Sequence, residues 1–220
     1  MSRRRSMAFP ANYEQYKVTV PAGRRGIAKI SRYTVTHKRA DEINWRILLH
    51  EEERAWAYPG KYTGLTVDGI MVMSDEAKEI ADHLPFIERA AGCILITGLG
   101  IGMVLQALLR KPEVEHITVV EKSADVLALV SGHYLAMFGG ERITLVNDSA
   151  FTWRPLAGAR FDFAWHDIWP VAAGVYWPEH QLLFDRYSAI VNEQDSWRGE
   201  WMRQRFRLAT ESLAPPPKSE

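Results

Sequence analysis

The chain has 220 residues, 47% of them hydrophobic and 25% charged, and its formal net charge is zero. A chain of this length and composition forms one globular domain with a substantial additional piece. A zero net charge creates no overall field that would attract nucleic acid or a membrane surface. No apolar run approaches the roughly 18 residues of a membrane span. We therefore expect neither a membrane segment nor a nucleic-acid partner.

Positive charge is concentrated near the N-terminus, where ten Lys and Arg residues occur up to Arg39, against the single acid Glu14. We interpret this segment as solvated and partly disordered, with binding of an acidic partner as the alternative. The arginines at 3–5 are not followed by the apolar stretch of a secretion signal. Cys93 is the only cysteine and cannot form a disulfide within the chain, which favours a cytoplasmic location.

Residues 1–74 are expected to form an N-terminal strand and hairpin region. Alternating apolar residues predict strands there, and apolar residues at helical spacing predict one helix. The strongest local signal is Asp68-Gly69, a typical hairpin turn between two short strands. The predicted elements are a loose tail at 1–12, strands at 13–20, 27–36, 65–67 and 70–73, and a helix at 40–54.

Residues 75–210 are expected to form a Rossmann-like domain. Ser74 is a suitable N-cap for its first helix, which Pro85 is expected to end or kink. Strand and helix patterns then alternate, which predicts an α/β fold: a mostly parallel sheet with helices on both faces. The predicted strands are at 94–97, 117–120, 142–146 and 161–165, with helices at 103–110 and 123–135.

Strand signals fade after Trp165. Residues 179–191 and 196–208 are both expected to be helices, and the proline-rich residues 211–220 are expected to be a disordered tail. The sheet is therefore expected to be truncated at its C-terminal side, or completed by N-terminal strands such as 27–36. An exposed sheet edge favours a covering helix or a homo-oligomer such as a dimer.

One stretch carries the clearest functional signal. The buried strand ending at Thr97 is followed by Gly98, Gly100 and Gly102 and then by a helix. Glycines let the backbone turn tightly and a ligand approach it, and a helix start offers N–H groups to polar ligand atoms. This pattern is typical of a nucleotide-binding turn in an α/β sheet. Met103 stands where a dinucleotide fingerprint requires Gly or Ala, which disfavours NAD.

Acidic residues follow the next three predicted strands. Glu121 ends the second strand, where an acid can accept hydrogen bonds from both ribose hydroxyls. Asp148 begins the Asp-Ser-Ala sequence after the third strand, where an acid can accept from an adenine amino group. Asp167 ends the fourth strand. Taken singly, such an acid is often only a helix cap or a turn residue. The glycines and three acids in register together indicate an adenosine-type ligand.

In this spacing, residues 65–170 resemble class I S-adenosylmethionine (SAM)-dependent methyltransferases. Ile96 replaces the acid that most of them have two residues before the first glycine, and the spermidine-synthase-like branch also has an apolar residue there. That branch shares the hairpin at 68–69, the Asp-Glu pair at 75–76, and an Asp with a nearby proline after strand four, here Asp167. The resemblance implies SAM as cofactor. The cofactor-binding residues that it implies are Gly98, Leu99, Gly100, Gly102, Glu121, Lys122, Asp148, Ser149 and Ala150.

The chain also departs from that branch. Spermidine synthases follow the Asp-Glu pair with Tyr-His-Glu, used for the polyamine site, whereas residues 79–81 are Glu-Ile-Ala. Their glycine loop contains an Asp where this chain has Ile101. Because few carboxylates remain to bind a cationic polyamine, we expect methyl transfer to an unknown small-molecule acceptor. The alternatives are aminopropyl transfer, acceptor-free cleavage or cyclisation of SAM, and non-catalytic SAM binding.

Asp167 is the expected catalytic residue, because it is placed to hold or deprotonate an acceptor amine or hydroxyl. His166, Trp169 and Tyr62 are candidates for substrate contact. Adjacent strand residues point to opposite faces, so one of His166 and Asp167 is expected to be structural. Trp169 either stabilises a cation or fills the core, and Tyr62 belongs either to a lid or to a packed turn. His166 and His180 lack a third ligand, so no metal site is expected.

Overall fold

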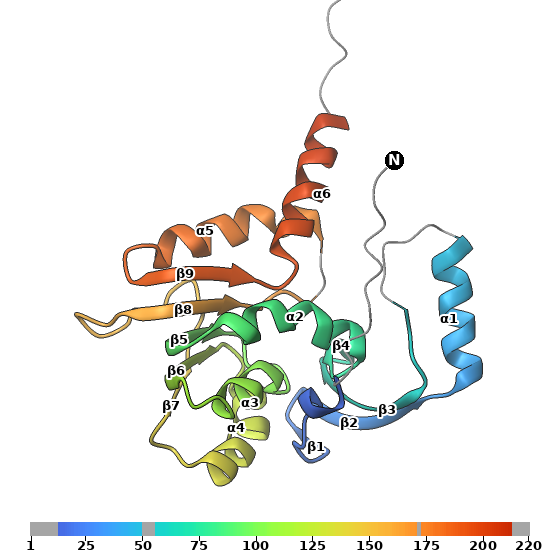
Figure 1. Ribbon diagram of the computed structural model, residues 1–220, viewed down its shortest axis with the longest axis horizontal. Helices are drawn as coiled ribbons and strands as arrows, with labels where there is room; N and C mark the ends of the chain where they lie inside the picture. The colour runs from blue at the N-terminus through green and yellow to red at the C-terminus, as the bar shows by residue number, and fades with distance from the viewer. Residues whose placement is uncertain (1–12, 50–55, 171–172, 213–220) are drawn as a thin grey trace, which may run out of the picture.

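The computed structural model describes residues 13–49, 56–170 and 173–212. These residues form two sheets, an antiparallel one from the N-terminal part and a parallel one from the remainder, with helix α2 between them (Figure 1). The predicted tail at 1–12 lies outside the described residues, as does the predicted tail at 211–220 except for residues 211 and 212, which belong to the last helix. The predicted α/β fold with a parallel sheet is confirmed.

The antiparallel sheet has the strand order β1-β2-β3-β4. Strands β3 and β4 are joined by the predicted two-residue turn at Asp68-Gly69, where both residues have positive φ, 51° and 77°. Such a turn matches the twist of the two strands that it joins. The strands are β1 (Gly23–Arg25), β2 (Ala28–Val35), β3 (Gly60–Val67) and β4 (Ile70–Ser74).

The strand predicted at 13–20 is wrong. Tyr13–Tyr16 form a single 3-10 turn, η1, and the chain then runs irregularly across the parallel domain. The N–H of Val18 donates to the Asp75 carboxylate at 3.2 Å, so that carboxylate takes the place of a neighbouring strand. Val18 and Val20 are nevertheless buried, which explains why their alternation resembles that of a strand.

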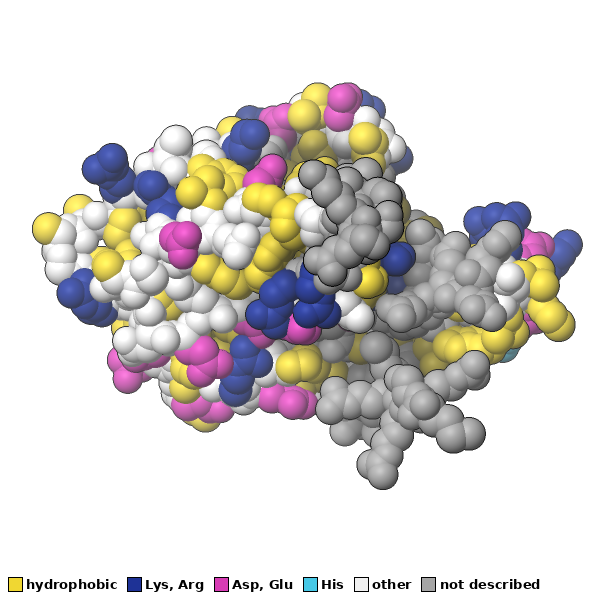
Figure 2. Space-filling model, turned by 90° about the horizontal axis from the view of Figure 1, so that it is seen from above, with side chains coloured by type: hydrophobic (Ala, Val, Ile, Leu, Met, Phe, Trp, Pro, Cys, Tyr) yellow, Lys and Arg dark blue, Asp and Glu magenta, His cyan; other side chains and the backbone are white. Residues whose placement is uncertain are grey.

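Helix α1 (His37–Leu49) begins three residues before its predicted start, and residues 50–54 of that prediction lie outside the described part of the chain. The side chain of Thr36 accepts from the N–H of Arg39 at 3.2 Å and so caps the helix. The helix projects from the body of the molecule (Figure 1). It exposes apolar side chains beside basic ones, at the right-hand end of Figure 2. Those more than half exposed are Trp45, Leu48 and Leu49.

Helix α2 (Ala77–Arg89) joins the two sheets, and it differs from the prediction at both ends. Its N-cap is Glu76 rather than Ser74, which is the last residue of β4. The Ser74 N–H donates to the Glu79 carboxylate at 2.7 Å, so Ser74 fixes the first turn from outside the helix. Pro85 does not end the helix, which continues through it to Arg89.

The parallel sheet has the order β7-β6-β5-β8-β9, so the first of its strands in the sequence, β5, lies at the centre. Alternate residues of β5 enter different cores: Ile94 and Ile96 pack toward α2, α3 and α4, and Leu95 packs toward α5. The strands are β5 (Gly92–Thr97), β6 (Val114–Glu121), β7 (Ile143–Asn147), β8 (Phe161–His166) and β9 (Val191–Ser196).

The crossover helices follow their sequence signals. Helix α3 (Met103–Leu109) is buried at every residue, which explains why it is apolar except for Gln106, whose side-chain N–H donates to the carbonyl of Lys17 at 2.9 Å. Helix α4 (Ala124–Phe138) begins at the predicted cap, since the hydroxyl of Ser123 accepts from the N–H of Val126 at 3.2 Å. Helix α5 (Trp177–Tyr187), preceded by the short turn η2 (Gly174–Tyr176), covers the opposite face.

The C-terminal region contains a strand that the sequence pattern does not reveal. The helix predicted at 179–191 ends as α5 at Tyr187, and β9 then pairs in parallel with β8. The last helix is α6 (Gly199–Ser212). Within β9 only Val191 and Ser196 are buried, so this edge strand has no apolar pattern. No described N-terminal strand pairs with the parallel sheet, and the suggestion that 27–36 completes it is wrong.

Candidate functional site

The carboxyl ends of four parallel strands meet at one edge of the sheet. The N–H of Gly98, after β5, donates to the carbonyl of Val120 in β6 at 2.9 Å, and the N–H of Asp167, after β8, donates to the carbonyl of Thr97 at 2.9 Å. On the other side of β6, the N–H of Asp148 donates to the carbonyl of Glu121 at 3.2 Å. The predicted glycine turn and the three predicted acids therefore lie along one edge, where α/β sheets bind ligands.

The glycine turn needs glycine at position 98, where φ is +92°. A Cβ on Gly98 would lie 2.0 Å from the carbonyl oxygen of Asp167, so any side chain would push the ends of β5 and β8 apart. Gly100, with φ of +54°, is half-buried, and its N–H has no hydrogen-bond partner among the described residues. The turn thus packs tightly against β8 and leaves one backbone donor available to a ligand.

Glu121 is tied to the glycine turn. Its Oε2 accepts from the N–H of Leu99 at 2.8 Å, and its Oε1 accepts from the N–H of Ser123 at 2.7 Å. Burial raises the pKa of Glu121 above its ordinary value, although these two hydrogen bonds act in the opposite direction. A carboxylate oxygen can accept two hydrogen bonds, and each oxygen of Glu121 accepts one here, so Glu121 keeps capacity for a ligand hydroxyl.

The other predicted cofactor residues lie around β7. Asp148 is half-buried, and its Oδ1 accepts from the N–H of Ser149 at 2.6 Å and from the hydroxyl of Thr152 at 2.9 Å. Ala150 is buried, and its carbonyl accepts from the Tyr187 hydroxyl at 2.6 Å. Lys122 is exposed beside Glu121. Asp148 therefore has one carboxylate oxygen, Oδ2, without a hydrogen-bond partner among the described residues.

Asp167 faces a histidine that sequence reasoning missed. Its Oδ2 lies 3.1 Å from Nε2 of His83, which belongs to α2 and is buried, while the Asp167 side chain is 17% exposed. Nδ1 of His83 contacts the backbone carbonyl of Glu79 one turn earlier. Glu79 and His83 share a helix face at i, i+4 spacing, which the sequence shows. The sequence does not show that Asp167, 84 positions further along, lies opposite.

Glu79 is a half-buried acid in the first turn of α2. Its carboxylate accepts from the N–H of Ser74 at 2.7 Å and from the Ser74 hydroxyl at 2.9 Å. Burial raises the pKa of Glu79 to about 7, against the effect of these hydrogen bonds. Glu79 occupies part of the segment where the sequence departs from spermidine synthases, and its carboxylate is engaged by the protein itself.

His166 lies on the opposite face of β8 from Asp167. Its ring is fully buried, with Nδ1 2.9 Å from the hydroxyl of Thr97 and Nε2 3.1 Å from the side-chain oxygen of Gln194. Burial lowers its pKa to about 4. The structure therefore places His166 as a neutral core residue and Asp167 at the edge, as strand alternation predicts.

Trp169 is also buried. Its ring stacks on His180 with centroids 3.4 Å apart, and its Nε1 donates to the Glu179 carboxylate at 2.8 Å. Trp165 and Trp177 are buried too. These tryptophans fill the core on both sides of β8, which favours the structural alternative over a cation-binding role.

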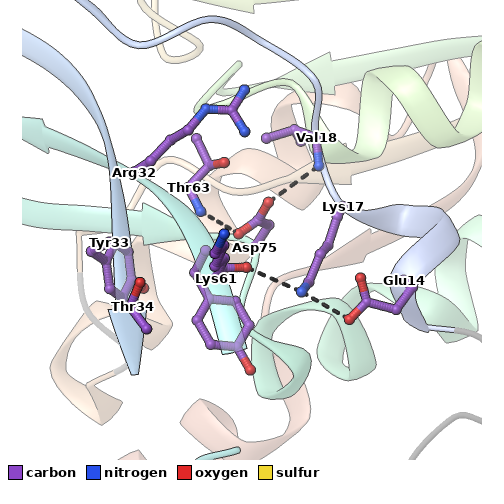
Figure 3. Close-up of a pocket in the computed structure, with 10 residues that line it drawn as sticks. Glu14, Lys17, Val18, Arg32, Tyr33, Thr34, Lys61, Thr63 and Asp75 are labelled. Atoms are coloured by element: carbon purple, nitrogen blue, oxygen red, sulfur yellow. Dashed lines mark hydrogen bonds and ion pairs between the residues drawn. The ribbon is translucent and has the colours of Figure 1, made fainter. Parts of the chain in front are cut away.

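Tyr62, the third predicted substrate residue, lines a pocket of about 370 Å³ beside the antiparallel sheet (Figure 3). It belongs to β3 and is 2% exposed, and its hydroxyl donates to the carbonyl of Tyr58 at 2.9 Å, so it is packed against the segment before the strand rather than placed as a lid. Lys17 extends across the pocket to Glu14 at 2.9 Å, and its Nζ lies 4.6 Å from the centre of the Tyr62 ring. Asp75 lies near the centre of Figure 3, where its carboxylate accepts from the N–H groups of Val18 and Thr63.

Within the described ranges, no group of three or more His, Cys, Asp or Glu side chains is arranged to hold a metal ion. None of the described helices has the length and apolar character needed to cross a membrane.

Comparison with known proteins gives partial matches. No protein-family model matches the chain. Two curated proteins of Ralstonia nicotianae, polyamine aminopropyltransferases 1 and 2, are each 34% identical to it over 90 residues, which is 37% of this chain. The match spans less than a fifth of either relative, 17% and 18%. This similarity agrees with the spermidine-synthase-like resemblance of the motifs.

Partial matches among solved structures include enzymes of two kinds. The spermidine synthase of Thermotoga maritima matches 87% of this chain and 62% of its own, at 14% identity and a TM-score of 0.47. A SAH-bound methyltransferase of Podospora anserina matches 66% of this chain and 72% of its own, at 14% identity and a TM-score of 0.44.

Proposed function

We propose that this chain binds SAM at the glycine turn and transfers its methyl group to a small-molecule acceptor. The observation that supports this most is the row formed by the glycine turn, Glu121, Asp148 and Asp167 at one edge of the parallel sheet. Direct hydrogen bonds between the strand ends, together with the bond from the Leu99 N–H to Glu121, hold the row together.

The residues present fit an adenosine-containing cofactor. Gly100 offers a backbone N–H, Glu121 offers acceptor capacity for ribose hydroxyls, and Oδ2 of Asp148 offers an acceptor for an adenine amino group. When bound, SAM supplies a methyl group activated by the sulfonium. The part left to the protein is to position the acceptor and to balance charge at the reacting atoms. Asp167 is the residue we assign to the acceptor.

Aminopropyl transfer is the second candidate, and the similarity to the polyamine aminopropyltransferases favours it. The charges of the described site favour methyl transfer. Asp75 and Glu79 are engaged by protein N–H groups. The pocket of Figure 3 presents three cations, Lys17, Arg32 and Lys61, against two acids, Asp75 and the Glu14 that pairs with Lys17. A polyamine carries several positive charges, which the net positive charge of this lining would repel.

Calorimetry with SAM, S-adenosylhomocysteine, methylthioadenosine and NAD tests the cofactor. We expect SAM and S-adenosylhomocysteine to bind and NAD not to bind, because the third glycine of the turn is one residue too early for a dinucleotide. If none of the four binds with a Kd below about 1 mM, the assignment of the glycine turn is wrong.

The variant Asp167→Asn tests the assignment of the acceptor side. We expect S-adenosylhomocysteine release in the presence of a panel of small amines and alcohols to fall by about 100-fold or more, while SAM affinity is retained. Release of a SAM-derived product without any acceptor would instead indicate cleavage or cyclisation. SAM binding without turnover under any condition would indicate a binding module.

A further inference from the structure

We propose that His83 is a positioning residue for Asp167: its Nε2 holds Oδ2 and leaves Oδ1 as the oxygen available to an acceptor. This inference rests on the proposed function, since it assigns Asp167 to the acceptor. His83 lies on α2, which precedes the glycine turn, and Asp167 follows β8, so the pair joins two elements that flank the site.

The hydrogen bonds of His83 fix where its protons are. The carbonyl of Glu79 can only accept, so Nδ1 carries a hydrogen. In a neutral ring, Nε2 would then present a lone pair to the lone pairs of the Asp167 carboxylate. The 3.1 Å contact between Nε2 and Oδ2 therefore contains a shared proton.

The balance of burial and charge places that proton on the ring. Burial disfavours a charged imidazole, but the hydrogen bond and the negative charge of Asp167 outweigh it, so the pKa of His83 is raised above its ordinary value. Two other acids on α2 act on the ring: Glu79, whose carboxylate is bound to Ser74, and Asp82, which is paired with Arg198 at 3.3 Å. Only Asp167 among these carboxylates is hydrogen-bonded to the ring.

The contact with His83 orients the Asp167 carboxylate by binding one of its two oxygens. Oδ2 is occupied, whereas Oδ1 has no hydrogen-bond partner among the described residues, and the side chain is 17% exposed. The ring itself cannot turn away, because it is held by the Glu79 carbonyl and packs 5.2 Å from the Trp165 ring. An acceptor N–H or O–H would therefore meet Oδ1 in a fixed direction, which is what positioning requires.

Nitrogen-15 NMR of histidine-labelled protein tests the pair. In the wild type at pH 6 we expect both ring nitrogens of His83 to be protonated. In Asp167→Asn we expect the titration midpoint of His83 to fall by about one pH unit or more. The matched control Asp82→Asn removes a nearby charge without removing a hydrogen bond to the ring, and its shift should be less than half as large.

Three results would overturn the proposal. One is a neutral His83 in the wild type at pH 6, a measurement that needs no variant. Another is a His83 midpoint that moves equally in the two variants. The third comes from His83→Gln, which keeps an N–H donor but cannot titrate. Its turnover should not depend on pH across the range in which wild-type His83 titrates, and an unchanged pH profile would exclude the positioning role.

The proposed function fails separately. If wild-type protein binds no SAM but His83 is doubly protonated and responds to Asp167→Asn, the pair exists and the assigned reaction is wrong. If SAM binds and is turned over while His83 is neutral, the reaction stands and the positioning role is lost.

Discussion

Two buried histidines flank the end of β8, and their surroundings act on them in opposite directions. His83 lies on the α2 side, against the Asp167 carboxylate, and its pKa is raised. His166 lies on the α5 side, between the neutral side chains of Thr97 and Gln194, and its pKa is lowered to about 4. Burial is nearly complete for both. The partner, and not the degree of burial, therefore decides which histidine carries charge.

The difference also separates two kinds of region. On the α2 side, a charged pair reaches a partly exposed carboxylate at the ligand edge. On the α5 side, neutral hydrogen bonds and stacked rings hold β8 against α5, with the ring centres of His166 and Tyr187 5.6 Å apart. The first region is suited to chemistry and the second to stability. Four substitutions test this division.

The largest effect is expected for Gly98→Ala. The new Cβ would lie 2.0 Å from the Asp167 carbonyl at a φ of +92°, which combines backbone strain with a clash. We expect a loss of about 3 kcal/mol or more in the free energy of unfolding, together with loss of SAM binding. The control is Gly158→Ala, where φ is +85° but nothing lies within 4 Å of the new Cβ. Urea unfolding that shows equal losses for both would contradict the close contact.

His166→Gln should reduce the loss of folding stability at acidic pH. In the wild type, the unfolded chain takes up the His166 proton at about pH 6.5, whereas the folded chain does so only near a pKa of about 4. Stability should therefore fall by up to roughly 3 kcal/mol as the pH falls through this window. Unfolding measured at several pH values should show a shallower acid slope in the variant. An unchanged slope would mean that His166 is not the neutral group we describe.

His83→Gln should change the pH dependence in the other direction. Because the folded pKa of His83 is raised, its contribution is fully present below its unfolded pKa and is lost as pH rises through the folded pKa. We expect the variant to lose about 2 kcal/mol at the acidic end, as for a hydrogen bond to a charged group, and less at alkaline pH. The same series of urea unfolding curves measures this, and an equal loss at every pH would argue against a charged ring.

The smallest effect is expected for Ser123→Ala, which lies in neither histidine environment. It removes the hydroxyl that caps α4, so we expect a loss of about 1 kcal/mol. The pH dependence of the free energy of unfolding should keep its wild-type form, since neither His83 nor His166 is touched. A changed pH dependence in this variant would show that the pH dependence reports general destabilisation and not the two histidines.

Local patterns in the sequence predict those parts of the fold that local physics controls. The Asp68-Gly69 turn, the Ser123 cap and the four consecutive strand ends each depend on neighbouring residues, and the structure confirms them. Strand β9 depends instead on its position at the edge, where polar residues suffice because only two of its side chains are buried. Helix α2 continues through Pro85 to Arg89, and the local sequence does not decide whether a proline ends a helix or is accommodated within it.

The candidate site divides in the same way. The glycine turn, Glu121, Asp148 and Asp167 are found from the sequence because parallel strands align their carboxyl ends. His83 is missed because its partner is set by how α2 packs against the end of β8, across 84 positions of sequence. Trp169 and His166 were candidates by proximity in sequence, and burial removes both from the exposed edge.

Strand β9 also affects how the molecule meets its neighbours. Two of its acids, Glu193 and Asp195, are both bound by the guanidinium of Arg89 from α2, each at 2.5 Å. A strand from another molecule that added to this edge would lie beside two carboxylates and a guanidinium, and charged side chains on an edge strand disfavour such pairing. These charges therefore disfavour lengthening of the sheet at β9, and one of them comes from the helix that also carries His83.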